Sequence, residues 1–122
     1  MTKGVGIDMV EVARIETSIN KESGFRELVF SAHEIGYCEA KAKKFEHYAA
    51  RFAAKEAFFK AIGTGWAKGT AFNEIEVYND ETGKPHIRLL GSTAATLHQL
   101  NVLHIQVSLS HTGSLGTAVV VI

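Results

Sequence analysis

A glutamate occupies a position on the longest predicted helix where the pattern favours an apolar side chain. The sequence predicts one helix over residues 45–63, because apolar side chains recur there at helical spacing: Phe45, Tyr48, Ala49, Phe52 and Phe59. Glu56 falls near the middle of that stripe, between Phe52 and Phe59. An unpaired carboxylate in an apolar environment is strongly destabilising. We therefore expect Glu56 to be protonated, salt-bridged or bound to a cation, and each state would give it a role.

The composition is that of one domain spanning residues 1–122. With 46% hydrophobic residues in 122, the chain can bury a sizeable core. We see no signal peptide and no apolar stretch long enough to span a bilayer, so we expect no membrane partner. The single cysteine, Cys38, fits a reducing cytoplasm. The 13 basic and 13 acidic side chains balance, which argues against a general nucleic-acid binder.

The order of predicted elements indicates an α+β fold with a mainly antiparallel sheet packed against one long helix. Strands are expected over residues 4–12, 72–78, 86–90, 102–110 and 115–122, and helices over 13–20, 45–63 and 92–100. A further helix begins after Ser31, which forms a capping-box pattern with Glu34. Residues 118–122 are all apolar, which predicts either a central strand buried on both faces or a strand that packs against another subunit.

A second carboxylate, Asp8, lies inside the predicted first strand, where aspartate is uncommon. Gly6 leaves room on the strand face that Asp8 shares. Asp8 is either a cap or edge residue, or it converges with Glu56 if the strand packs on the long helix. Two such hard oxygen ligands suit Mg²⁺, which takes one or two carboxylates together with water and substrate phosphate.

Basic side chains near this pair have two interpretations each. Lys60 follows Glu56 by four residues, so it forms either a helical ion pair or a cation aimed at phosphates held by the metal. Arg51 lies on another helix face and would need another target, such as a terminal phosphate. His111 ends a predicted strand and is either a turn residue or a catalytic one. The glycine-containing loop after residue 63 lacks a P-loop pattern, and is either a helix stop or a loop whose amides reach a nucleotide.

Three segments together resemble the holo-acyl-carrier-protein synthase family of 4′-phosphopantetheinyl transferases. They are residues 6–15 (GIDMVEVARI), 51–65 (RFAAKEAFFKAIGTG) and 108–111 (SLSH), and residues 30–34 and 83–85 fit at the expected spacing. The resemblance runs from residue 4 to residue 122. It implies transfer of the 4′-phosphopantetheine arm of coenzyme A to a serine of apo-acyl carrier protein, in fatty acid biosynthesis, with release of adenosine 3′,5′-bisphosphate. It also implies a need for Mg²⁺ and a homotrimer with each active site in a cleft between two subunits.

The resemblance assigns the catalytic residues by motif position. Asp8 and Glu56 would be the metal ligands, and Lys60 would face the pyrophosphate of coenzyme A. The serine nucleophile belongs to the carrier protein, so the chain needs none of its own. Glu56 or a metal-bound water could take the serine proton, and the water is favoured because Glu56 is already assigned to the metal.

The resemblance also assigns the residues that bind coenzyme A and the carrier protein. Arg51 and His111 would contact the 3′-phosphate end, and Gly65 and Pro85 would border the adenine pocket. The residues that would meet the acidic recognition helix of the carrier are Arg14, Lys21 and Arg26. The family often has arginine where this chain has Lys21, so carrier docking is expected to be weak to moderate and sensitive to salt.

Two other functions are compatible with the same fold. One is a catalytically silent module that binds a nucleotide or a carrier protein. The other is a metal-dependent phosphatase, in which water replaces the serine and coenzyme A is consumed without a carrier. Asp8, Glu56 and Lys60 are all intact, which favours the transferase over a silent module.

Overall fold

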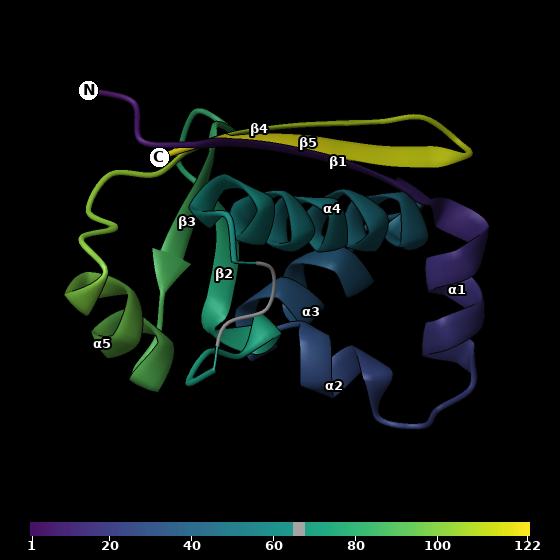
Figure 1. The fold of residues 1–122 in the computed structure, drawn as a ribbon. Coiled ribbons are helices and arrows are strands. Elements are labelled where there is room, and N and C mark those ends of the chain that lie inside the picture. Colours follow the sequence, from purple (N-terminus) through teal and green to yellow (C-terminus); the bar gives the residue numbers. More distant parts are fainter. Residues whose placement is uncertain (65–67) are drawn as a thin grey trace.

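The long helix α4 (Lys44–Ile62) lies at the centre of the fold. The computed structural model describes residues 1–64 and 68–122. One side of α4 is covered by a three-stranded sheet, and the other side by α2, α3 and a two-stranded hairpin (Figure 1). The sheet consists of β1 (Val5–Glu11), β5 (Leu115–Val121) and β4 (Gln106–His111), and the layer below contains α2 (Phe25–Val29), α3 (Ala32–Glu39), β2 (Ile75–Asn79) and β3 (Pro85–Leu89).

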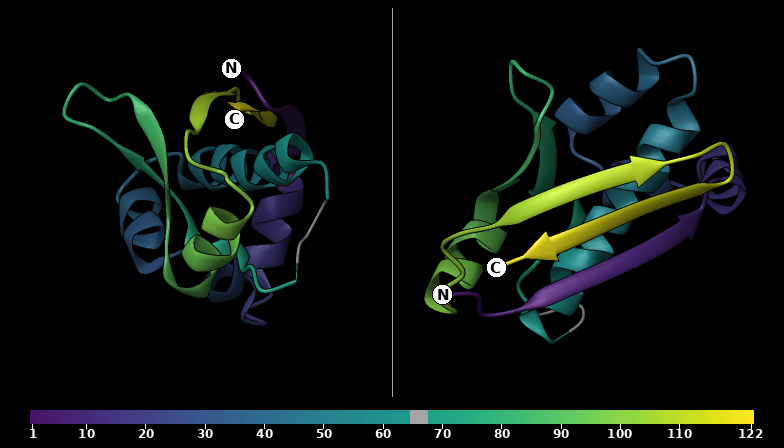
Figure 2. Two further views of the ribbon diagram at one scale, coloured as in Figure 1. Left: turned by 60° about the vertical axis from the view of Figure 1, so that its left-hand side comes forward. Right: turned by 90° about the horizontal axis from the view of Figure 1, so that it is seen from above.

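All strand pairs are antiparallel, which confirms the predicted α+β class. The larger sheet has the order β1–β5–β4, so β5 is its central strand (Figure 2). Asp8 of β1 pairs with Ala118 of β5, which in turn pairs with Leu109 of β4. The hairpin β2–β3 forms a second sheet, whereas the sequence suggested a single one. Two short helices complete the chain, α1 (Val12–Asn20) after β1 and α5 (Gly91–Gln99) before β4.

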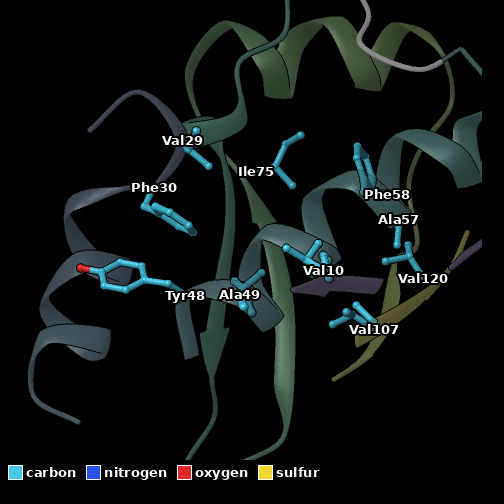
Figure 3. Packing of buried hydrophobic residues seen from close by; sticks show 14 of the residues in the cluster. Val10, Val29, Phe30, Tyr48, Ala49, Ala57, Phe58, Ile75, Val107 and Val120 are labelled. Atoms are coloured by element: carbon cyan, nitrogen blue, oxygen red, sulfur yellow. The ribbon is translucent and has the colours of Figure 1, made fainter. Parts of the chain in front are cut away.

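The core lies on both sides of α4, so this helix is buried around most of its circumference. Toward the sheet, Ala57 lies near Val120, as Figure 3 shows. Toward the other layer, Tyr48 packs against Phe30 with ring centroids 4.8 Å apart. Small side chains such as Ala57 let the sheet approach the helix closely, and the aromatic side chains fill the opposite side.

The predicted ends of two helices are confirmed. The Ser31 hydroxyl accepts a hydrogen bond from the Glu34 amide, and the Glu34 carboxylate accepts one from the Ser31 amide, which completes the capping box of α3. Helix α4 ends at Gly63, whose φ of 81° is left-handed and therefore favours glycine.

Three predicted segments differ from the structure. Residues 72–74 form a 3₁₀ turn because the Glu74 carboxylate accepts a hydrogen bond from the Thr93 hydroxyl at 2.6 Å, which ties the segment to α5. Strand β4 begins at Gln106, four residues later than predicted, because the Val102 amide binds the Leu97 carbonyl and closes the end of α5. Helix α2 was not predicted, because five residues are too few for a helical pattern.

The apolar strand β5 is buried on one face only. Ala118 and Val120 face α4 and are buried, whereas Val119 and Val121 are half-buried on the outer face. The prediction of burial on both faces is therefore wrong for the single chain. Among the described residues, no helix is long and apolar enough to cross a membrane.

Candidate functional site

Asp8 and Lys60 meet between β1 and the C-terminal half of α4. Asp8 lies on the same strand face as the buried residues Gly6 and Val10, so its side chain is directed toward the helix. The Lys60 ammonium group donates to Asp8 Oδ1 at 3.0 Å and to the Ile7 carbonyl at 3.0 Å. The helical ion pair between Lys60 and Glu56 is not found among the described residues. Lys60 instead links the helix to the strand.

Glu56 stands beside this pair and is half-buried, and no hydrogen bond or ion pair joins it to another described residue. Burial raises the pKa of the Glu56 carboxyl above its ordinary value, and the negative charge of Asp8 raises it further. The positive charges of Lys60 and Arg14 oppose this shift. In the part of the chain that the structure describes, its carboxylate has no ion pair. Of the three states expected for Glu56, a protonated carboxyl and a cation-bound carboxylate remain.

The two carboxylates fit a magnesium ion rather than a zinc ion. Within residues 1–64 and 68–122, no group of three or more histidine, cysteine, aspartate or glutamate side chains could hold a metal. A structural zinc site would need such a group. Mg²⁺ needs only one or two carboxylates when substrate phosphates and water complete its shell. Asp8 and Glu56 supply that number, and the like-charge crowding between them would be relieved by a cation.

Arg51 belongs to a different cluster, on the side of α4 that faces the β2–β3 hairpin. Its side chain is buried, and its Nη2 atom donates to Asn79 Oδ1 at 2.7 Å. The guanidinium group also stacks on the Tyr37 ring, 4.0 Å from the centroid. Its Nε atom is buried and has no hydrogen-bond partner. Asn79 pairs with Pro85 across the hairpin, so the structure brings Arg51 and Pro85 into one region.

His111 joins the same cluster through His47. The His111 Nδ1 atom lies 2.8 Å from Glu46 Oε1, and the rings of His111 and His47 lie 4.9 Å apart. Burial lowers the pKa of His47, and the nearby positive charges of His111, Arg51 and Lys41 lower it further. This region is therefore crowded with basic groups, which is a suitable environment for an anion.

One chain does not bring all the predicted site residues together. Glu46, which holds His111, precedes Glu56 by ten residues, or about 15 Å along the helix axis. Asp8 and His111 also lie on opposite edge strands of the sheet, separated by β5. The acidic pair and the basic cluster are thus two separate half-sites on one chain. Gly65, predicted to border the adenine pocket, lies outside the described residues.

The three residues predicted to bind a carrier protein lie on α1, directly after it and on α2, and they differ in their surroundings. Arg14 and Lys21 are exposed, and Arg14 is close enough to Glu56 for its charge to affect that carboxyl. Arg26 is already engaged within the chain, because it forms ion pairs with Glu27 at 2.8 Å and with Glu39 at 3.3 Å. Any acidic partner of Arg26 would have to compete with these two carboxylates.

The structure also contains a buried ion pair that the sequence did not reveal. Lys55 and Glu34 are both completely buried, and Lys55 Nζ lies 2.8 Å from Glu34 Oε1. The only signal in the sequence was that Lys55 falls within a nearly continuous run of small and aromatic residues. The amphipathic pattern placed Glu56, and not Lys55, on the buried stripe.

Comparisons with known proteins identify the family of the chain. A model of the 4′-phosphopantetheinyl transferase superfamily matches residues 4–120. The holo-[acyl-carrier-protein] synthase of Cytophaga hutchinsonii is 51% identical over 113 residues, which cover 91% of this chain and 89% of that protein. The crystal structure of the corresponding Neisseria meningitidis enzyme superposes with a TM-score of 0.88 at 32% identity, and covers 99% of this chain and 98% of that one.

A further solved structure, from Helicobacter pylori, is a holo-[acyl-carrier-protein] synthase in complex with coenzyme A. It superposes with a TM-score of 0.83 at 32% identity, and covers 95% of this chain and 96% of that one. The resemblance seen in the three sequence motifs is thereby confirmed over nearly the whole chain. Because the family model spans residues 4–120 and the fold matches throughout, the chain belongs to the 4′-phosphopantetheinyl transferase superfamily.

Proposed function

We propose that this chain transfers the 4′-phosphopantetheine group from coenzyme A to a serine of apo-acyl carrier protein and releases adenosine 3′,5′-bisphosphate. The observation that carries the proposal is the meeting of Asp8, Glu56 and Lys60 between β1 and α4, which gives the family's sequence motifs a common location. Relatives named holo-[acyl-carrier-protein] synthase support it, as does the similar Helicobacter pylori enzyme solved with coenzyme A.

In this proposal, Asp8 and Glu56 hold Mg²⁺, which neutralises phosphate charge and helps to orient the pyrophosphate when it is bound. Lys60, whose ammonium group is bonded to Asp8, lies beside this proposed metal site and supplies a further positive charge for the pyrophosphate. Positioning and charge neutralisation provide most of the catalysis in phosphoryl transfer. The serine hydroxyl comes from the carrier, and its proton passes to Glu56 or to solvent at the site.

The basic cluster would receive the other end of coenzyme A. Arg51 and His111 are proposed to contact the 3′-phosphate, and Pro85, with Gly65, to border the adenine. The unpartnered Nε of Arg51 and the crowding of positive charge around His47 support an anion at this place. Arg51 is only 2% exposed, so a direct contact with phosphate requires a local rearrangement that uncovers its guanidinium group.

We also propose a homotrimer in which each active site lies between two subunits. The outer sheet face supports it, because Val5, Ile7 and Met9 of β1 are 60%, 66% and 64% exposed beside the half-buried Val119 and Val121. Such apolar patches favour protein contacts. A neighbouring subunit could also complete the site, since the acidic pair and the basic cluster are separated within one chain.

Native mass spectrometry of Val5→Glu tests the trimer. The charge should disrupt the assembly, whereas the same change at Leu28, which is 72% exposed on α2 and lies across α4 from the sheet, should not. A wild-type chain that stays monomeric at all concentrations would refute the trimer.

The carrier is proposed to dock on Arg14, Lys21 and Arg26. Its affinity should then fall with added salt, because exposed charges are screened within about 10 Å at 0.1 M.

The decisive experiment measures the intact mass of an apo-acyl carrier protein after incubation with this chain, coenzyme A and Mg²⁺, beside an EDTA control. The carrier should gain one phosphopantetheine group only when the metal is present. Release of adenosine 3′,5′-bisphosphate without a carrier would favour the phosphatase instead. Absence of both products with several carriers would favour a silent binding module.

A further inference from the structure

At Gly4 and Gly6, the N-terminal part of β1 and the residue before it approach α4 with no side chain of their own between the two backbones. A Cβ atom added to Gly6 would lie 1.9 Å from the Ala57 carbonyl oxygen and 2.7 Å from the Ala61 amide nitrogen. A Cβ atom on Gly4 would lie 2.0 Å from the Ala61 carbonyl oxygen. Real Cβ contacts are essentially never shorter than 3.0 Å, so both positions require the absence of a side chain.

We infer that Gly6 is a positioning residue, which sets the distance between β1 and α4 and thereby the size of cation that Asp8 and Glu56 accept together. This inference rests on the proposed metal site. Asp8 follows Gly6 by two residues on the same strand face, and Glu56 immediately precedes Ala57, whose carbonyl limits the approach. One backbone contact therefore controls the position of both carboxylates.

The contacts of Lys60 provide independent support for this close approach. Its ammonium group bonds to a main-chain atom of the strand, the Ile7 carbonyl, as well as to Asp8. A strand displaced outward would draw both acceptors away from the helix. The distance between β1 and α4 therefore fixes the contact between the Lys60 ammonium group and the Asp8 carboxylate, in addition to the packing of the core.

A side chain at Gly6 would displace β1 by more than the difference between the Mg²⁺–oxygen and Ca²⁺–oxygen distances. To accommodate a methyl group at Gly6, the strand must move by about 1 Å. Mg²⁺ binds oxygen at about 2.0–2.1 Å and demands near-ideal geometry, whereas Ca²⁺ accepts about 2.3–2.6 Å in flexible geometry. A wider gap should therefore weaken Mg²⁺ binding more than Ca²⁺ binding.

Gly116 offers a matched control on the neighbouring strand. A Cβ atom there would lie 2.6 Å from the Ala50 amide nitrogen and 2.7 Å from the Ala49 carbonyl carbon. Gly116→Ala thus strains the contact between β5 and α4 in a similar way, but at Ala49 and Ala50, which precede Glu56 on the helix by seven and six residues. It should lower stability without changing the gap between the two carboxylates.

Isothermal titration of Mg²⁺ and of Ca²⁺ into the wild type, Gly6→Ala and Gly116→Ala, each with coenzyme A and no carrier, tests the inference. Gly6→Ala should bind Mg²⁺ about 10–100-fold more weakly than the wild type, as is typical when a metal ligand loses its support. Its preference for Mg²⁺ over Ca²⁺ should fall. Gly116→Ala should keep the wild-type affinities although its unfolding temperature also falls.

Several outcomes would overturn the inference. If Gly6→Ala binds Mg²⁺ like the wild type, or if both variants lose it equally, Gly6 has only a structural role. If the wild type itself does not bind Mg²⁺, the proposed metal site fails as well. Should Gly6→Ala not fold, Asp8→Glu changes the distance between the two carboxylates by one methylene. It leaves the contact of Gly6 with Ala57 unaltered. An unchanged Mg²⁺ affinity in Asp8→Glu would then refute the importance of the gap.

Discussion

Lys55 and Glu56 are neighbours on α4, yet their charges have opposite surroundings. Lys55 is completely buried, and its ammonium group donates to Glu34 and to the carbonyls of Phe72 and Ile75. Glu56 is only half-buried, but it has no bonded partner among the described residues, and the nearest carboxylate, Asp8, repels it. The more deeply buried charge is therefore the better satisfied of the two.

The same contrast separates the core from both half-sites. In the core, opposite charges are paired and fully hydrogen-bonded, which is the condition for burying them. At the two candidate sites the pairing is incomplete. The charge of Asp8 raises the pKa of Glu56 although Lys60 is paired with Asp8, and several positive charges lower the pKa of His47 although Glu46 lies beside His111. Like charges held together in this way favour a ligand of opposite charge. Burial alone does not distinguish the two kinds of charge, because Arg51 is only 2% exposed. Full pairing, as between Lys55 and Glu34, indicates a structural charge, and like-charge crowding indicates a candidate ligand site.

The largest effect on stability is expected for Lys55→Met. The variant leaves the Glu34 carboxylate buried and without its cation, which should lower the free energy of unfolding by about 3–5 kcal/mol. Urea denaturation at neutral pH measures it. As a control, Lys44→Met removes the partly exposed pair of Lys44 with Glu39, which should cost less than about 1 kcal/mol. Equal losses in the two variants would contradict the comparison.

A smaller effect, dependent on pH, is expected for His47→Gln. The lowered pKa of His47 means that the unfolded chain takes up its proton more readily than the folded one. His47 therefore contributes stability that is present above its ordinary pKa of about 6.5 and is lost as the pH falls below it. Between pH 7.5 and pH 5, the unfolding temperature should drop less in His47→Gln than in the wild type.

The exposed residue His98 on α5 provides the matched control for this measurement. His98→Gln should follow the pH profile of the wild type. If His47→Gln and the wild type lose stability in parallel, the basic cluster does not resist protonation, and the contrast between crowded and paired charges would not extend to this half-site.

The smallest effect on stability is expected for Glu56→Gln. The amide keeps the shape of the side chain and removes a charge that burial and Asp8 disfavour, so the free energy of unfolding should not fall and should stay within about 0.5 kcal/mol of the wild type. Metal-dependent transfer to the carrier should nevertheless be lost. Denaturation and the carrier mass assay together check this prediction. A stable Glu56→Gln variant with full activity would remove Glu56 from the metal site.

Much of the fold was predictable because its signals are local. The capping box of Ser31 and Glu34 spans three residues, and Gly63 ends α4 by its own backbone preference. The apolar period of α4 and the main strands were likewise visible in the chain. Asp8 and Glu56 stood out because each carries a charge where its own element disfavours one, and that conflict is a property of single residues.

The tertiary structure alone determined which distant groups meet. Glu34 and Lys55 are 21 residues apart, and no local pattern specifies that they form a buried pair. Packing also separated Asp8 and Glu56 from Arg51 and His111, although the family motifs treat them as one site. The sequence by itself thus determined the elements and the unusual charges. Which of these charges are paired and which are kept apart depended on how the other elements pack around α4. Electrostatic interactions depend on distance in space and not on distance along the chain.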